Sequence, residues 1–184
     1  VGAEAGGHPP VNGVSTLVTV RQVLRQVSIP VIAGGGVADG WGIAALLALG
    51  AEGVQLGTRF LMTNEATVHA NYKAAVQKAQ AADVVLVGAR SLPIRMLRNR
   101  FAQSIFDAES HQGDQSAYED VFKSSSLRQA ALEGDIEWGK VEAGQSAGLV
   151  DAVQPAAVVM QELIAELDCA TRRLADMASE AVPA

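Results

Sequence analysis

The sequence predicts an α/β protein in which short parallel strands alternate with helices. Two apolar runs, residues 31–33 and 53–56, have the length of buried strands, and each is followed directly by glycine. Between them, residues 39–49 carry apolar side chains at helical spacing. A strand, a crossover helix and a second strand form a right-handed parallel unit, from which α/β folds are built.

The same alternation continues on both sides of this unit. Strands are predicted at residues 1–5, 30–33, 53–56 and 83–87. Helices are predicted at residues 15–27, 39–49 and 63–80. Ser15 or Thr16 can cap the first of these helices, and Thr63 or Asn64 can cap the third, because short polar side chains accept hydrogen bonds from the free N–H groups of a first turn.

From Ser91 onward the strand pattern stops. Residues 107–116 are polar and predict a loop. The remaining helices are predicted at residues 117–132 and 155–179. Small residues are frequent within residues 134–150, so backbones or a ligand are expected to approach closely there.

Several arginines gather between the last predicted strand and the polar loop. They are Arg90, Arg95, Arg98 and Arg100. They can solvate a helix face and pair with Asp107 or Glu109, or one of them can meet an anionic substrate or phosphate. The first interpretation is favoured, because exposed ion pairs of this kind are common and each contributes little.

Composition and charge narrow the functional class. The 184 residues carry a formal net charge of −6 with a pI near 5.0, which argues against a nucleic-acid partner. A single cysteine, Cys169, excludes a disulfide framework and a multi-cysteine metal site, so no metal is predicted; this residue is expected to be a small buried or half-buried hydrophobe.

No apolar run of about eighteen residues and no secretory leader occur, which favours a soluble cytoplasmic protein. The start at Val1 rather than methionine is typical of a truncated or processed chain.

Small residues after the two central strands predict a phosphate site. Residues 34–36 are all glycine, and Gly57-Thr58 follows the second strand. Backbone N–H groups in such loops can approach an anion, and barrels commonly bind phosphate at their last two strand-to-helix loops. Asp39 stands where the dinucleotide fingerprint needs its third glycine, and no P-loop motif occurs. The loops therefore favour a single phosphate.

His8 is the candidate catalytic residue. It follows Gly6-Gly7 at the end of the first predicted strand, which places it on the rim where barrel active sites lie. An imidazole titrates near neutral pH and suits a general base. His69, inside a predicted helix, and His111, in the polar loop, are expected to be structural or solvated.

The chain resembles the nitronate monooxygenase family (formerly 2-nitropropane dioxygenases), which includes the FMN-dependent enoyl-ACP reductases of type II. The resemblance rests on GAEAGGH at 2–8, PVIAGGGVADG at 30–40, GAEGVQLGTRFLMTNEATVHANYK at 50–73 and GDIEWGKVEAGQSAGLV at 134–150. It implies a TIM (β/α)8 barrel that binds FMN at its C-terminal rim, with a small helical domain appended. Family members are about twice as long, so the resemblance covers a C-terminal portion.

The resemblance implies three regions and a set of site residues. Residues 1–90 would form the C-terminal half of the FMN-binding barrel, residues 91–150 a small substrate-domain region and residues 151–184 a C-terminal helix. His8 matches the catalytic histidine of the family. The cofactor-binding residues expected from the loops and the resemblance together are Ala5, Gly6, Gly7, Gly35, Gly36, Gln55, Leu56, Gly57 and Thr58.

The activity that the resemblance implies is oxidation of an alkyl nitronate or nitroalkane by FMN and O2 to a carbonyl compound and nitrite. His8 would remove the α-proton when the substrate arrives as the neutral nitroalkane. One alternative is an FMN-dependent enoyl-ACP reductase, in which NAD(P)H reduces the flavin; another is an inactive half-barrel or a split subunit. The expected partners are a small-molecule substrate, either a nitronate or an enoyl thioester, and O2, with no nucleic acid and no membrane. A homodimer stays open.

Overall fold

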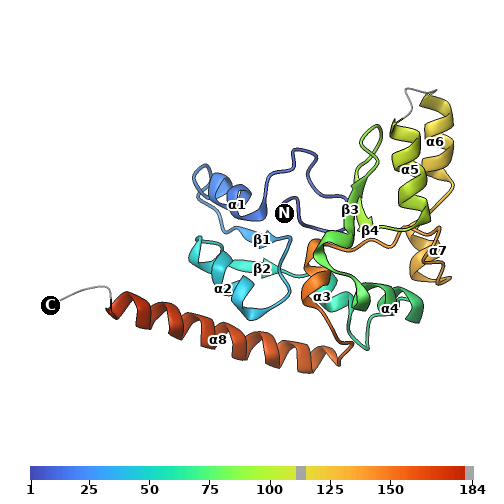
Figure 1. Cartoon of the computed structure of the whole chain (residues 1–184). Helices are drawn as coiled ribbons and strands as arrows, with labels where there is room; N and C mark the ends of the chain where they lie inside the picture. The colour runs from blue at the N-terminus through green and yellow to red at the C-terminus, as the bar shows by residue number, and fades with distance from the viewer. Residues whose placement is uncertain (111–114, 181–184) are drawn as a thin grey trace.

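The computed structural model describes residues 1–110 and 115–180, which form an α/β arrangement of short strands and helices (Figure 1). The elements in chain order are α1 (Thr16–Leu24), β1 (Ile32–Gly34), α2 (Gly40–Ala48), β2 (Gly53–Gln55), α3 (Thr58–Leu61), α4 (Ala70–Lys78), the 3-10 helix η1 (Ala81–Asp83), β3 (Val84–Val87), β4 (Ile94–Leu97), α5 (Arg100–Ser110), α6 (Gln115–Lys123), α7 (Leu127–Ala131), the 3-10 helix η2 (Gln145–Leu149) and α8 (Ala156–Glu180). Within the two described ranges, none of the helices combines the length and apolarity that crossing a bilayer requires.

The predicted strand–helix–strand unit is present. β1 and β2 pair in parallel, and α2 connects them. The carboxylate of Asp39 begins α2 by accepting a hydrogen bond from the N–H of Gly42 at 2.7 Å. One apolar cluster joins this unit to α1 and contains the buried side chains of Val20, Ala33, Val37, Leu46 and Ala51. The unit therefore holds the glycine-rich ends of β1 and β2 side by side.

Of the four predicted strands, the one at 1–5 is absent, and the one at 83–87 is present but lies outside the parallel pair. Within residues 1–5, the N–H of Gly2 donates a hydrogen bond to the carbonyl of Gly34, at the end of β1, at 3.0 Å. The N–H of Ala3 instead donates to the carbonyl of Val14, so no ladder with β1 forms. The run at 83–87 forms β3, but it pairs antiparallel with the unpredicted strand β4 instead of extending the parallel pair. The arginine inside β4 interrupts the apolar pattern that marks a buried strand.

The helix predicted at 63–80 is shorter and begins later. The chain makes the single turn of α3 directly after Gly57, and α4 begins only at Ala70. His69 caps α4, because its Nδ1 accepts a hydrogen bond from the N–H of Asn71 at 3.1 Å. His69 thus lies at a helix start and not inside a helix, with the structural role that was expected.

The region after β4 is more helical than predicted. α5 continues to Ser110, through part of the predicted loop, while residues 111–114, with His111, lie outside the described residues. The helix predicted at 117–132 is divided into α6 and α7. The division lies at Ser126, whose hydroxyl accepts a hydrogen bond from the N–H of Gln129 at 3.2 Å and so begins a new helix.

α8, of 25 residues, lies along α2 and extends past it (Figure 1). Its buried side chains are Val159, Leu163 and Ala170. The carboxylate of Glu166 accepts a hydrogen bond from the N–H of Gly40 at 2.8 Å, which joins the two helices. α8 therefore covers the outer side of the central unit.

The buried face of α8 is narrower than its apolar pattern predicts. The apolar side chains of Val158, Ile164 and Leu174 are exposed. Cys169 is likewise exposed and not buried.

The arginine-rich stretch is tied into the fold. The contacts are Arg90 with the carbonyl of Glu109, Arg95 with the carbonyl of Ala3, Arg98 with the ring of Phe106 and Arg100 with the carboxylate of Glu137. Each arginine thus has a partner within the fold, but the expected helix face is wrong for Arg95, which is buried in β4, and only Arg90 contacts Glu109, through its backbone carbonyl.

Candidate active site

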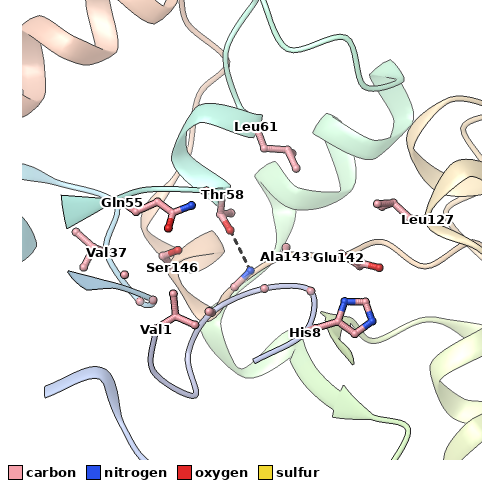
Figure 2. Close-up of a pocket in the computed structure, with 18 of the residues that line it drawn as sticks. Val1, His8, Val37, Gln55, Thr58, Leu61, Leu127, Glu142, Ala143 and Ser146 are labelled. Carbon is pink, nitrogen blue, oxygen red and sulfur yellow. Dashed lines mark hydrogen bonds between the residues drawn. The ribbon is translucent and has the colours of Figure 1, made fainter. Parts of the chain in front are cut away.

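A pocket of about 370 Å³ lies where the ends of β1 and β2 meet the segment around residue 142 (Figure 2). Its volume is typical of small-molecule sites, which span about 300–1,000 Å³. The predicted site residues that line it are Ala5, Gly6, Gly7, His8, Gly35, Gly36, Gln55, Gly57 and Thr58. Leu56 differs, because its side chain packs against the apolar cluster of the central unit.

The pocket has two distinct ends. Figure 2 shows Gln55, Thr58 and Ser146 toward one end, and His8 and Glu142 toward the other. We call the first the glycine end, since residues 34–36 and Gly57 also lie there, and the second the histidine end. A ligand that fills the pocket would touch both.

The backbone at the glycine end is open to a ligand. Gly35 and Gly36 have φ angles of 107° and 75°, in the left-handed region that glycine tolerates best. A Cβ atom built on Gly57 would meet no heavy atom within 4 Å, so the space beside this residue is free. Small residues here leave room for an anion to approach the main chain.

Thr58 adds a hydroxyl group to the glycine end. Its Oγ1 accepts a hydrogen bond from the N–H of Gly144 at 2.9 Å, the dashed line in Figure 2. A hydroxyl that accepts one bond keeps its own proton to donate. The N–H of Gln145 donates to the carbonyl of Glu4 at 3.0 Å, which holds residues 144–146 against the pocket.

β4 positions the histidine end. The N–H of Gly7 donates to the carbonyl of Arg95 at 3.0 Å, and the N–H of Arg95 donates back to Gly7 at 2.6 Å. The guanidinium of Arg95 also donates through Nε to the carbonyl of Ala3 at 2.7 Å. Burial lowers the pKa of Arg95, and the nearby Glu4 carboxylate opposes that change. The position of His8 is therefore set by the pairing of its neighbour Gly7 with β4. The predicted strand that would have ended just before His8 does not form.

Glu142 is a pocket residue that the sequence reasoning missed. Burial raises the pKa of its carboxyl group above the ordinary value, while electrostatic interactions with His8 and Lys140 act in the opposite direction. Tyr72 donates its hydroxyl to the backbone carbonyl of Glu142 at 2.5 Å, and burial, followed by the Glu142 charge, raises the pKa of Tyr72. The small residues after Glu142 predicted close packing, but no motif marked the glutamate itself.

Apolar side chains form another wall of the pocket. They are Leu61, Val68, Leu127 and Ala131, from α3, the segment before α4, and α7. Such a wall suits the alkyl part of a small substrate. Sequence reasoning could not place it, because α3 and α7 are brought together by the tertiary fold.

Comparison with known proteins places these features in a family. Residues 1–166 match the family model described as Nitronate monooxygenase. A probable nitronate monooxygenase of Staphylococcus aureus (strain JH9) is 36% identical over 177 residues, which are 91% of this chain and 49% of the relative. FabK from Thermotoga maritima superposes with a TM-score of 0.89 at 42% identity, over 96% of this chain and 55% of that one. Nitroalkane oxidase from Streptomyces ansochromogenes superposes with a TM-score of 0.76 at 33% identity, over 94% of this chain and 52% of that one.

The chain spans about half the length of these relatives. The matched region includes both glycine loops, His8 and Glu142, and thus both ends of the pocket. Since the family model matches the chain from its first residue into α8, this protein belongs to the nitronate monooxygenase family.

Proposed function

We propose that this protein uses FMN to oxidise alkyl nitronates or nitroalkanes with O2, giving a carbonyl compound and nitrite. The observation that carries the proposal is the two-ended pocket, in which an open glycine-rich backbone lies at one end and His8 at the other. The proposed cofactor-binding residues are those of the two loops and the turn before His8. Membership of the nitronate monooxygenase family supports the reaction class.

The glycine end fits the phosphate of FMN. The free space beside Gly57 leaves room for phosphate oxygens near main-chain N–H groups, and Gly35 and Gly36 supply the left-handed backbone of the neighbouring turn. The hydroxyl of Thr58 can donate one further hydrogen bond. FMN carries a single phosphate, in keeping with loops that lack the dinucleotide pattern.

The protein's own part in the chemistry is proton removal and positioning. Bound FMN would supply the redox chemistry with O2. When the substrate is a neutral nitroalkane, His8 accepts the α-proton, the C–H bond breaks, and its electron pair remains on the substrate as the nitronate. A positioned base of this kind contributes about 10²–10⁴-fold to the rate. The apolar wall with Leu61 and Leu127 would hold the alkyl group and keep water away from it.

We propose further that residues 1–90 supply the C-terminal half of a (β/α)8 barrel, residues 91–150 a small substrate domain and residues 151–184 a C-terminal helix. The parallel pair of β1 and β2, with its crossover helix, supports the barrel assignment. The length of the relatives supports a larger catalytic unit, in which further residues complete the pocket.

The alternative function is an FMN-dependent enoyl thioester reductase. The observation that favours it is the higher likeness to FabK, at 42% identity, than to nitroalkane oxidase, at 33%. The same glycine end would hold FMN in either case. The two functions differ in the electron donor, because a reductase needs NAD(P)H whereas nitronate oxidation does not.

The electron donor therefore provides the test. Reconstituted with FMN, the protein is expected to consume O2 with ethylnitronate in the absence of NAD(P)H. A matched reaction with an enoyl thioester and NADPH is expected to proceed much more slowly. If the protein takes up no O2 with the nitronate, and if it oxidises NADPH only when the thioester is present, the protein is the reductase and not the nitronate oxidase.

A further inference from the structure

Glu142 and His8 reach the histidine end from opposite parts of the chain, and β4 holds both. Gly7, next to His8, exchanges two backbone hydrogen bonds with Arg95. Glu142 forms a bridge with Met96, the next residue of β4, while the N–H of Leu97 donates to the carbonyl of Val141 at 2.9 Å. Successive residues of one buried strand thus fix the two functional side chains. Figure 2 shows the imidazole and the carboxylate at the same end of the pocket.

The carboxylate of Glu142 lies directly against the turn that carries His8. Its Oε2 is 3.0 Å from the position that a Cβ atom would take on Gly7. The charged and titratable groups that face Glu142 are His8, Lys140 and Tyr72. Tyr72 is already engaged, because its hydroxyl donates to the backbone carbonyl of Glu142.

Lys140 is committed to other groups. Its ammonium nitrogen lies 4.2 Å from the centre of the Phe122 ring and 5.4 Å from that of Phe101. It also donates a hydrogen bond to the carbonyl of Phe122 at 3.1 Å. Burial lowers the pKa of Lys140, and Glu142 opposes that change from a distance. His8 is therefore the titratable side chain that shares the histidine end of the pocket with Glu142.

We propose that Glu142 is the positioning residue for His8, and that its carboxylate stabilises the imidazolium formed when His8 accepts the substrate proton. The inference rests on the proposed function in taking His8 as the base. In that step the proton leaves the α-carbon for an imidazole nitrogen, and the pair of electrons stays on the substrate. A carboxylate at the same end of the pocket gains a favourable charge interaction as the imidazole becomes positive, so it acts mainly on the transition state.

The first test needs neither flavin nor substrate. In protein labelled with ¹³C-glutamate, the carboxyl signal of Glu142 is assigned by its loss in Glu142→Gln and then titrated with pH. His8→Asn removes a group whose electrostatic interaction lowers the pKa of Glu142, so the titration midpoint should move upward. His69→Asn, which replaces a different imidazole by another capping residue, should leave the midpoint unchanged. A midpoint that His8→Asn does not move would overturn the proposal.

The second test separates positioning from folding in the FMN-loaded enzyme. Glu142→Gln keeps the shape of the side chain and removes its charge. We expect kcat/KM for a neutral nitroalkane to fall about tenfold, with a much smaller change for the preformed nitronate, which needs no proton removal. Glu137→Gln, the same substitution at an exposed neighbour paired with Arg100, should change neither value.

The two tests fail in different ways. Equal losses of Glu142→Gln on nitroalkane and nitronate would mean that Glu142 supports the fold or contacts the substrate itself, and the positioning role would be wrong. If the unsubstituted enzyme oxidises neither substrate, the proposed function fails, while the carboxyl titration still decides whether Glu142 and His8 are electrostatically coupled.

Discussion

Gly36 and Gly57 line the same end of the pocket, but a side chain would affect them differently. Gly36 has a φ of 75°, and a Cβ there would lie 3.1 Å from the Cβ of Glu4. A branched residue would strain this backbone whether or not a ligand is bound. Gly57 has an ordinary φ of −102°, and a Cβ there would meet nothing within 4 Å. Gly57 is therefore the residue at which ligand binding can be tested apart from folding.

We expect Gly57→Val to keep its thermal midpoint close to that of the unsubstituted protein and to weaken FMN binding by at least about tenfold, or ~1.4 kcal/mol. The branched side chain would occupy the space that the phosphate needs. Quenching of FMN fluorescence on titration with protein measures the affinity. Gly36→Val serves as the contrasting variant, which should lose stability as well as binding. Unchanged FMN affinity in a folded Gly57→Val protein would show that the phosphate does not bind at this loop.

Some site residues are readable from the sequence because their role is local. A run of glycines after an apolar strand marks an open backbone wherever the strand lies in the fold, so Gly35, Gly36 and Gly57 could be placed in advance. Glu142 and Leu127 are different, since each reaches the pocket through pairing or packing with elements far away in the chain. No local pattern distinguishes them from other glutamates and leucines.

α8 contributes an ion pair whose two partners differ in exposure. Arg59, in α3, is buried, and its guanidinium contacts the carboxylate of Glu162 at 2.8 Å and the side chain of Gln154 at 2.9 Å. On the same helix, Arg172 and Asp168 form an exposed pair, also at 2.8 Å. The two pairs have the same length, but the Glu162 carboxylate joins α8 to α3 and also accepts a hydrogen bond from Gln154, whereas the exposed pair lies within one helix.

We expect Glu162→Ala to lower the free energy of unfolding by about 1–2 kcal/mol, because it leaves the buried Arg59 charge with one remaining partner. The matched variant Asp168→Ala should lower it by about 0.5 kcal/mol or less, since exposed pairs contribute little. Urea unfolding followed by circular dichroism measures both. Equal effects of the two substitutions would mean that the Arg59 pair does not anchor α8 to the body of the protein.

The elements that the sequence predicts well are those with an uninterrupted local pattern. β1, α2 and β2 combine apolar periodicity with clear start and stop residues, such as the capping Asp39. β4 was missed because Arg95 breaks its apolar run, although the guanidinium folds back onto the carbonyl of Ala3. The helix predicted at 63–80 is too long, because the apolar spacing continues through the residues before α4. His69 caps α4, so the helix begins only at Ala70.

At the scale of the whole molecule, the pocket is assembled from distant segments. The pocket is lined by residues 5–8 and 34–36 from the first part of the sequence and by residues 142–146 from a much later part. β4 connects the two groups, because Arg95 pairs with Gly7 and Met96 pairs with Glu142. The resemblance to nitronate monooxygenases could be read from the sequence motifs and is confirmed, whereas the way in which β4 joins the two halves of the pocket depends on tertiary pairing.

The central claim is that the two ends of this pocket have separate functions. The glycine end binds the phosphate of FMN, and His8 at the other end removes the proton from the substrate. The most direct measurement compares His8→Asn with the unsubstituted FMN-loaded enzyme on one compound in two protonation states, the neutral nitroalkane and its preformed nitronate. FMN should stay bound, and turnover of the nitroalkane should fall by about 10²–10⁴-fold, while the nitronate loses much less. Equal losses on both forms, or loss of FMN, would contradict the account, because His8 would then support binding or the fold and would not act as the base.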